Sequence, residues 1–304
     1  MALFLLSAPL SFASFDKAEN WGFDQGGGFR QGNFTGKDAG MVVADLVWDS
    51  ERNHMAVAGA LGDQWAARVY KVNANGPQLV AGWDGNNSMP FSTVTQLAWL
   101  PESGELVCGV EYIERGKPKV RVLTLNINNE KEFIANDIAG MEAFTELVTD
   151  SNNTQNVLVV GSGLGGARCL SVNPRSGVSS FGFSMDEIIH PMGMADLDGK
   201  IWVAGNDKKG KLIIELYDDE ELISKKAFGK NIFVSDMKVS GEGVFIVGRS
   251  LEPKKEKEKE NFFLKSFKWN GKKIKQSWAV RAKDSGGDGP LGTTTGAMIN
   301  PLYG

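Results

Sequence analysis

The stretch "VLVVGSGLGG" (residues 157–166) runs from an apolar segment into a cluster of glycines. By itself this pattern resembles a dinucleotide-binding turn, which needs a helix directly after the glycines so that the helix N-terminus can hold the pyrophosphate. The residues that follow are "ARCLSVNPRSG" (167–177), and Pro174 and Gly177 would interrupt a helix within about two turns. The stretch therefore predicts a turn between two strands and no nucleotide site.

The same apolar run ending in glycine recurs along the chain every 43 to 52 residues. Its copies are "MAVAG" (55–59), "LVCG" (106–109), "LVVG" (158–161), "WVAG" (202–205) and "FIVG" (245–248). Each copy follows a short alternating segment and a turn, and each precedes a third strand and a weaker fourth one. Four short antiparallel strands at this period are typical of the blades of a β-propeller. Such blades stack around an axis because none can cover both of its faces alone.

We therefore predict one all-β domain over residues 1–304, a six-bladed β-propeller of four-stranded antiparallel blades. Five blades are expected at approximately 40–85, 90–138, 143–184, 190–229 and 233–282. The sixth blade is expected to be split between residues 1–30 and 290–304, so that terminal strands share one sheet and close the ring. The apolar start "MALFLLSAPLSFAS" also fits a secretory signal peptide, although no positive charges precede its apolar core.

The unit formed by "SDMKVSGEGVFIVGRS" (235–250) and "NFFLKSFKWNGKKIKQSWAV" (261–280) resembles the SBBP-type β-propeller repeats of bacterial and algal surface or secreted proteins. The resemblance rests on strand and turn positions and extends over most of the chain, although the second and third blades depart from it in their third strands and loops. It implies a propeller with an extracellular binding or structural role, and it offers no catalytic residues. A secreted or cell-surface location follows from the resemblance, and a cytoplasmic one is the alternative if the N-terminus is a blade strand.

Composition narrows the classes of partner. A net charge of -4 and a pI near 5.4 argue against a general binder of nucleic acids or anionic membranes, which needs a basic face. Cys108 and Cys169 are the two cysteines, too few for a disulfide framework or a cysteine zinc site. No apolar run reaches the roughly 18–20 residues that span a bilayer. We expect a soluble monomer without a cofactor, a nucleic-acid partner or a membrane span.

The innermost strands of a propeller line its central channel, and polar residues recur there. Alignment of the predicted first strands places the following residues at equivalent positions: Asp45, Gln96, Glu146, Gly193, Asp236 and Gly296. Carboxylates in such a ring could bind Ca²⁺ or a basic ligand group. They could also serve acid–base chemistry on a glycan, or accept hydrogen bonds from backbone amides of neighbouring blades. His190, in the loop "DEIIHPMG" (186–193), precedes a channel strand and could reach the channel mouth.

Tryptophans offer a second kind of binding surface. Trp48, Trp99 and Trp202 lie at repeat positions in strands and are expected in the core. Trp21, Trp65 and Trp83 lie in or near predicted loops, where an aromatic face could stack on a sugar ring.

The alternating charge run "EPKKEKEKEN" (252–261) has no apolar side, and we expect it to form a solvated hairpin loop.

These patterns predict a non-catalytic binding or scaffold propeller that recognises a protein or glycan through one face or the channel mouth. The candidate ligand-binding residues are Asp45, Gln96, Glu146, His190 and Asp236. The alternative is a propeller enzyme, a glycan hydrolase or lyase, that uses the channel carboxylates.

Overall fold

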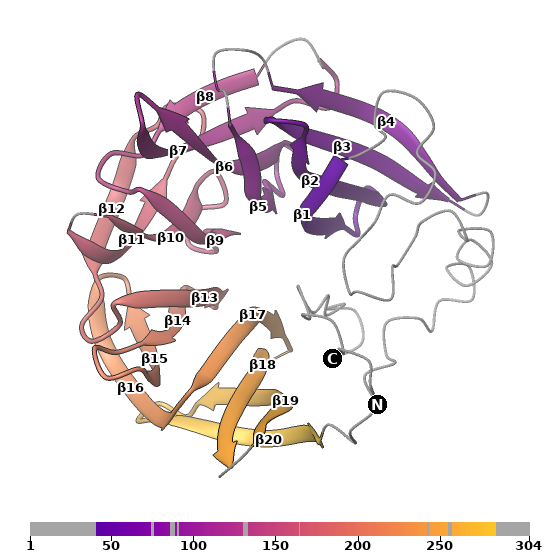
Figure 1. Ribbon diagram of the computed structural model, residues 1–304. Coiled ribbons are helices and arrows are strands. Elements are labelled where there is room, and N and C mark those ends of the chain that lie inside the picture. Colours follow the sequence, from indigo (N-terminus) through magenta and orange to yellow (C-terminus); the bar gives the residue numbers. More distant parts are fainter. Residues whose placement is uncertain are drawn as a thin grey trace.

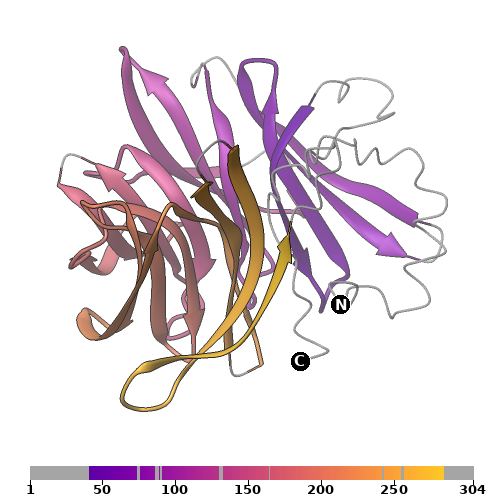
Figure 2. The same cartoon turned by 60° about the horizontal axis from the view of Figure 1, so that its bottom comes forward.

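The computed structural model describes residues 41–283 except 74–75, 86–88, 90, 130–132, 164, 242 and 255–256. The described residues form 20 strands in five four-stranded sheets. The sheets stand around a common centre, with β1, β5, β9, β13 and β17 innermost (Figure 1). In the turned view each sheet is strongly twisted from its inner to its outer strand (Figure 2), as expected for β-strands of L-residues.

The strands pair antiparallel in chain order within each blade. Blade 1 contains β1 (Met41–Asp49), β2 (His54–Leu61), β3 (Gln64–Asn73) and β4 (Gly76–Asp84). Blade 2 contains β5 (Thr93–Trp99), β6 (Leu106–Glu114), β7 (Lys117–Leu125) and β8 (Phe133–Asp137). Blade 3 contains β9 (Ala143–Thr149), β10 (Val157–Gly163), β11 (Gly166–Val172) and β12 (Ser179–Ser184). Blade 4 contains β13 (His190–Leu197), β14 (Lys200–Asn206), β15 (Lys211–Asp218) and β16 (Glu221–Lys230). Blade 5 contains β17 (Ile232–Ser240), β18 (Gly243–Lys254), β19 (Lys257–Trp269) and β20 (Ile274–Lys283).

The predicted all-β propeller fold is confirmed. The glycine-rich stretch 157–166 forms the β10–β11 hairpin, as expected for a turn between two blade strands. The predicted sixth blade, shared by residues 1–30 and 290–304, lies outside the described residues. Within the described part of the chain, no helix has the length and apolar character that a membrane span requires.

The recurring glycine has a physical cause in the inner strand that it faces. Each inner strand has a bulge-like irregularity, and in four blades this irregularity presses a backbone carbonyl against the glycine of the second strand. A Cβ added at the glycine would collide with that oxygen in the pairs Gly59 with Val42, Gly161 with Ala143, Gly205 with His190, and Gly248 with Phe233. In these four blades, the glycine that ends the apolar run is therefore explained by the close approach of the inner-strand backbone, which leaves no room for a Cβ.

Blade 2 departs from this pattern by one residue. Val94 pairs with Val110, so Val110 occupies the place that glycine has in the other blades, and Gly109 pairs with Gln96. The sequence alignment of Gly109 with the other glycines was therefore wrong by one position. Gly109 is crowded by a different group, because the Phe144 ring lies 3.2 Å from the position of an added Cβ.

The hydrophobic core lies between the blades, where facing sheets bury their side chains against each other. Trp65 of blade 1, for example, packs edge-to-face on Phe133 of blade 2 with ring centroids 5.6 Å apart. The residue after the channel position of the inner strand also enters these layers, as Met194 and Met237 do. Each such buried side chain contributes roughly 1.5–3 kcal/mol to folding.

The tryptophans divide differently from the prediction. Trp99 and Trp202 are buried as expected, whereas Trp48 is 36% exposed. Trp65 and Trp83 are buried in β3 and β4, so they offer no face to a sugar, and Trp21 lies outside the described residues.

The prediction of a loop for the charge run 252–261 is also corrected, because its described residues belong to the strands β18 and β19. Glu252 pairs with Lys259 and Lys254 with Lys257, which extends the β18–β19 hairpin. Alternation of Lys and Glu has the two-residue period of a strand, so the backbone can stay extended without an apolar face.

Candidate functional site

Five of the six predicted channel positions lie in the described residues and are equivalent in the structure, whereas Gly296 lies outside the described residues. Each follows the irregularity of its inner strand and pairs with the middle of the second strand. The residues at this position are Asp45 in β1, Gln96 in β5, Glu146 in β9, Gly193 in β13 and Asp236 in β17. A bulge re-aims the side chains that follow it, and here it does so at the same level of every described blade.

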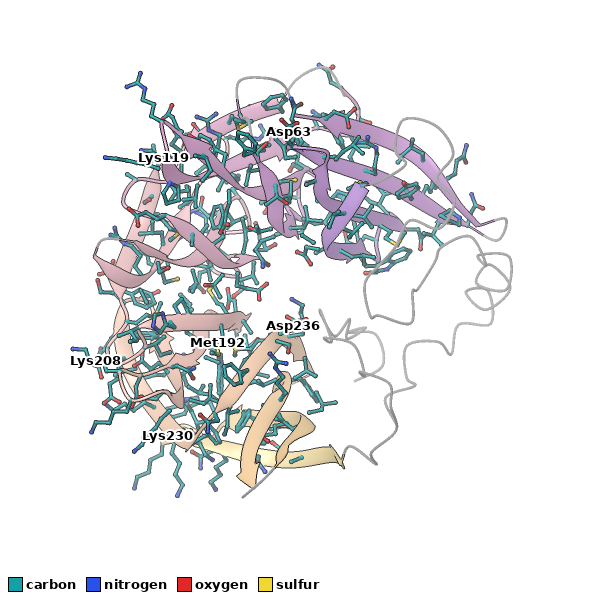
Figure 3. The ribbon with its side chains drawn as sticks, viewed as in Figure 1. Asp63, Lys119, Met192, Lys208, Lys230 and Asp236 are labelled. Atoms are coloured by element: carbon teal, nitrogen blue, oxygen red, sulfur yellow. The ribbon has the colours of Figure 1, made fainter. Side chains whose placement is uncertain are left out.

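Three of these residues gather around Lys238, which lies two positions after Asp236 in β17. The Lys238 Nζ is 2.9 Å from Asp236 Oδ1 and 3.5 Å from Glu146 Oε1. Asp45 is close enough to interact electrostatically with both Lys238 and Asp236. Figure 3 shows Asp236 at the inner edge of blade 5, facing the centre of the ring. We call Asp45, Glu146, Asp236 and Lys238 the channel cluster; its members come from blades 1, 3 and 5.

Burial sets the protonation of the channel cluster. Glu146 and Asp236 are 6% and 7% exposed, whereas the Lys238 side chain is 37% exposed. Burial raises the pKa of Glu146 to about 8; Lys238 opposes this rise and the charges of Asp236 and Asp45 add to it. Burial also raises the pKa of Asp45 to about 6. Burial alone would lower the pKa of Lys238, but the charges of Glu146 and Asp236 outweigh it and raise that pKa above its ordinary value.

Asp45 also joins blade 1 to blade 2. Its Oδ1 accepts a hydrogen bond from the backbone N–H of Leu46 at 2.8 Å, and its Oδ2 accepts one from that of Leu97 at 2.7 Å. Glu111 of β6 makes a similar connection between blades 2 and 3, because its Oε1 accepts a bond from the backbone N–H of Phe144 at 2.7 Å. Hydrogen bonding to the amides of a neighbouring blade, one of the three uses considered for these carboxylates, is therefore observed at Asp45.

Gln96 and His190 are placed differently from the carboxylates. Gln96 is half-buried on β5 at the equivalent position. Its amide is uncharged, so it adds no charge to the channel cluster. His190 is exposed as the first residue of β13, where its backbone pairs with Asn206. The acidic residues before it, Asp186 and Glu187, bind Lys225 of the outer strand β16.

The described residues do not form a metal-binding site of the predicted kind. No group of three or more His, Cys, Asp and Glu side chains among the described residues is arranged to hold a metal ion. In the channel cluster an ammonium group lies within ion-pair distance of two of the three carboxylates.

Lys238 is the member of the cluster that the sequence prediction missed. The signal was present in "SDMKV", because residues two apart in a strand share a face, so Lys238 must point to the same side as Asp236. Its pairing with Glu146 of another blade has no local signal.

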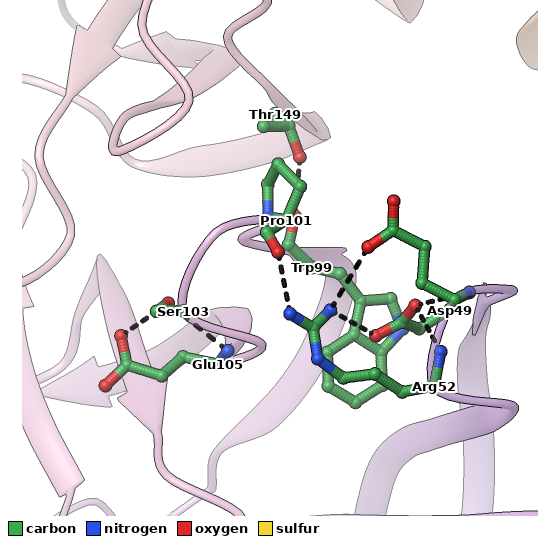
Figure 4. Close-up of polar contacts among 8 residues, drawn as sticks. Asp49, Arg52, Trp99, Pro101, Ser103, Glu105 and Thr149 are labelled. Carbon is green, nitrogen blue, oxygen red and sulfur yellow. Dashed lines mark hydrogen bonds and ion pairs between the residues drawn. The ribbon is translucent and has the colours of Figure 1, made fainter.

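The turns between inner and second strands hold neighbouring blades together on one face of the ring. Arg52, bound to Asp49 at 2.9 Å, donates through Nη2 to the carbonyl of Pro101 at 2.8 Å, and thus joins blades 1 and 2 (Figure 4). The hydroxyl of Thr149 donates to the carbonyl of Trp99 at 2.7 Å, which joins blades 3 and 2. These bonds fix the blades relative to one another and hold the inner strands in place.

Comparison with solved structures places the chain among β-propellers. A chain of the "Crystal Structure of Mitotic Checkpoint Complex" is 13% identical, with 80% of this chain and 66% of that chain covered and a TM-score of 0.57. The hydrazine synthase of Kuenenia stuttgartiensis is 9% identical, with 82% and 69% covered and a TM-score of 0.60. TolB from Acinetobacter baumannii is 9% identical, with 80% and 58% covered and a TM-score of 0.51.

These likenesses show the fold alone, and the chain spans between 58 and 69% of the length of the chains it matches. No family model and no curated protein sequence matches the chain. The SBBP type therefore stays a prediction, while the propeller repeat architecture that it implied is present.

Proposed function

We propose that this propeller is a non-catalytic binding protein that recognises a protein partner at the channel mouth through a basic side chain of that partner. The observation that carries the proposal is the unequal charge of the channel cluster. Among the four groups of the cluster, the three carboxyl groups of Asp45, Glu146 and Asp236 lie around one ammonium group, that of Lys238. When all four groups are ionised, the cluster keeps an excess of negative charge in a largely buried position.

A bound cation would relieve this excess. The raised pKa of Glu146, about 8, means that its carboxyl carries a proton at neutral pH in the free protein. An Arg or Lys side chain from a partner could replace that proton and leave Glu146 ionised, since an opposite charge nearby favours the charged form. Asp236 and Glu146 would then bind two cations, Lys238 and the ligand's group.

The other candidate functions have less support. Acid–base catalysis on a glycan needs a pair of carboxyl groups that face the substrate. Here Lys238 bonds to Glu146 and Asp236, and Asp45 uses both oxygens on backbone amides. Burial of Trp65 also removes one expected sugar platform. A protein partner agrees with one structural neighbour, which is a chain of the Mitotic Checkpoint Complex.

The proposal is tested by selection from a phage-displayed library of random peptides. We expect peptides enriched in Arg or Lys to bind the wild-type protein and to lose binding to the double variant Glu146→Gln/Asp236→Asn. The control Asp218→Asn/Glu221→Gln removes the same number of charges at the exposed β15–β16 turn, and it should bind like wild type. Thermal unfolding of both variants checks that they are folded.

Calorimetry of the selected peptides provides a second readout. Titrations at neutral pH in buffers of different ionisation enthalpy should show release of up to about one proton per bound peptide, because Glu146 becomes ionised. Selected peptides without basic residues, or equal binding to wild type and to the channel double variant, would refute the proposal.

A further inference from the structure

A cavity of about 410 Å³ lies where blades 2 and 3 meet, away from the channel cluster. Its walls come from the end of β8 with the two residues that follow it, from β11, and from β12 with the turn before it. Ile138, Leu170 and Phe181 supply apolar surface, and Asp137, Arg168 and Ser179 supply polar groups. Ser179 is exposed, so solvent reaches the cavity. The volume falls in the range of small-molecule sites.

Arg168 is the unusual group in this cavity. Its Nε is buried and has no hydrogen-bond partner, and the ion pairs found among the described residues do not include Arg168. The guanidinium lies beneath a turn at Gly140, where φ is +75°, and its Nη1 is 2.8 Å from the position that a Cβ on Gly140 would occupy. The absence of that Cβ makes room for the guanidinium.

The acidic residue of the cavity does not neutralise Arg168. Asp137 accepts hydrogen bonds through Oδ1 from Arg121 Nε at 2.6 Å and from the Tyr112 hydroxyl at 3.1 Å. The hydrogen bond from Arg121 holds the pKa of Asp137 below its ordinary value, so the carboxylate stays ionised and paired. Asp137 and Arg121 neutralise each other. The Glu220 carboxylate also lies at the cavity, where its Oε1 accepts a hydrogen bond from the backbone N–H of Gly182 at 3.3 Å, but no ion pair found among the described residues joins it to Arg168.

An unpaired, partly buried guanidinium is unfavourable, because the N–H groups that it withdraws from water are not satisfied by the protein. A carboxylate satisfies this group best, since its two oxygens match the fork of N–H donors. The apolar walls require that the rest of the ligand be compact and apolar. We propose that this cavity binds a carboxylate attached to a compact apolar group, with Arg168 as the anion-binding residue.

The test uses two probes that carry this chemistry in different forms. One is 3-phenylpropanoate with its uncharged amide as the comparison, and the other is a short peptide ending in Phe, with a free or an amidated C-terminus. Binding to the full chain is measured by saturation-transfer NMR and by calorimetry. We expect each acid to bind about tenfold or more tightly than its amide, as a charge-assisted bidentate pair predicts.

Substitutions of Arg168 locate the site. Arg168→Met keeps the apolar stem and should weaken binding of the acids about tenfold, and Arg168→Lys should weaken it less because the charge remains but the fork is lost. Arg115→Met, at an exposed turn of blade 2, is the matched control and should bind like wild type. Arg168→Met should also unfold at the same temperature as wild type or higher, because the described residues show no bond of Nε to lose.

The outcomes separate the sources of the carboxylate. Binding of the free acid assigns the site to small carboxylic acids, and binding of the peptide alone assigns it to chain termini; both support the proposal. Equal binding of acid and amide, binding unchanged in Arg168→Met, or binding of neither probe would overturn it. Should Arg168→Met fail to fold, the comparison of Arg168→Lys with wild type still decides.

Discussion

The raised pKa of Glu146 makes the stability of the propeller depend on pH in a defined direction. The folded protein binds a proton at Glu146 more tightly than the unfolded chain does, so folding is favoured at low pH and this contribution is lost as pH rises through the folded pKa of about 8. Asp45 is about half ionised at pH 6 and largely ionised by about pH 7, so over most of the range from about pH 6 to about pH 8 Glu146 is the member of the cluster that titrates. We expect wild type to lose stability over this range.

The size of the loss follows from linkage. One proton bound in the folded state and released in the unfolded state gives a slope of at most about 1.4 kcal/mol per pH unit. Solvent reaches the partly exposed Lys238 and screens the cluster, so we expect about 1–3 kcal/mol over the two units. For a chain of this size that corresponds to a fall in Tm of about 5 °C.

Urea unfolding of wild type and Glu146→Gln, followed by tryptophan fluorescence at several pH values, measures this effect. The amide cannot ionise, so the variant should lose about 1–3 kcal/mol less than wild type over the same range. Contributions from other titrating groups are common to both proteins and cancel in the difference. Glu221→Gln, on the exposed edge of β16, should keep the wild-type slope. Parallel slopes for wild type and Glu146→Gln would refute the reasoning.

Three further outcomes test other parts of the structure. Gly161→Ala should destabilise the fold by about 2 kcal/mol or more, because its Cβ would meet a carbonyl oxygen of β9, whereas Gly165→Ala in the same hairpin meets open space and should stay within about 0.5 kcal/mol; equal urea midpoints would disprove the close-approach explanation. Glu215→Ala should cost about 3 kcal/mol in urea unfolding, because the Glu187 backbone N–H and the Tyr217 hydroxyl, which both donate to the buried carboxylate, would lose that partner; a loss below about 1 kcal/mol would show that water replaces it. Lys238→Met should steepen the loss of stability above neutral pH, because the carboxylates lose their counter-charge; a pH profile unchanged from wild type would contradict the ion pairing.

The fold could be predicted from the sequence to the extent that its signals are local. Alternation within a strand and the glycine that a bulge crowds both depend on neighbours in one hairpin, so they recur in the sequence at each blade. The alignment failed at Gly109 because it matched the blades by their glycines alone. The position that faces the crowding carbonyl is set by pairing with the inner strand, and in blade 2 this pairing places Val110 there. The run 252–261 was predicted as a hairpin loop and not as paired strands, because an apolar face was taken as the mark of a strand.

The candidate site divides in the same way. Equivalence of Asp45, Glu146 and Asp236 follows from counting along similar strands, and the position of Lys238 follows from the two-residue period. The number of carboxylates around the Lys238 ammonium depends on distances across the ring, between residues about 90 or more positions apart in the sequence. The repeat period of the sequence gives no information about such distances.

The sequence by itself determined the repeating hairpins and the polar residue that four of the five described blades present at one level of the inner strand, because side-chain direction and backbone crowding are set within a few residues. Only the tertiary structure decided which charges meet. It brought Lys238 to Glu146 from two blades away, and it left Arg168 with a buried, unbonded Nε in the cavity beside Asp137. Electrostatic pairing and its absence depend on distance in space, and the chain brings these groups together only when the blades have stacked.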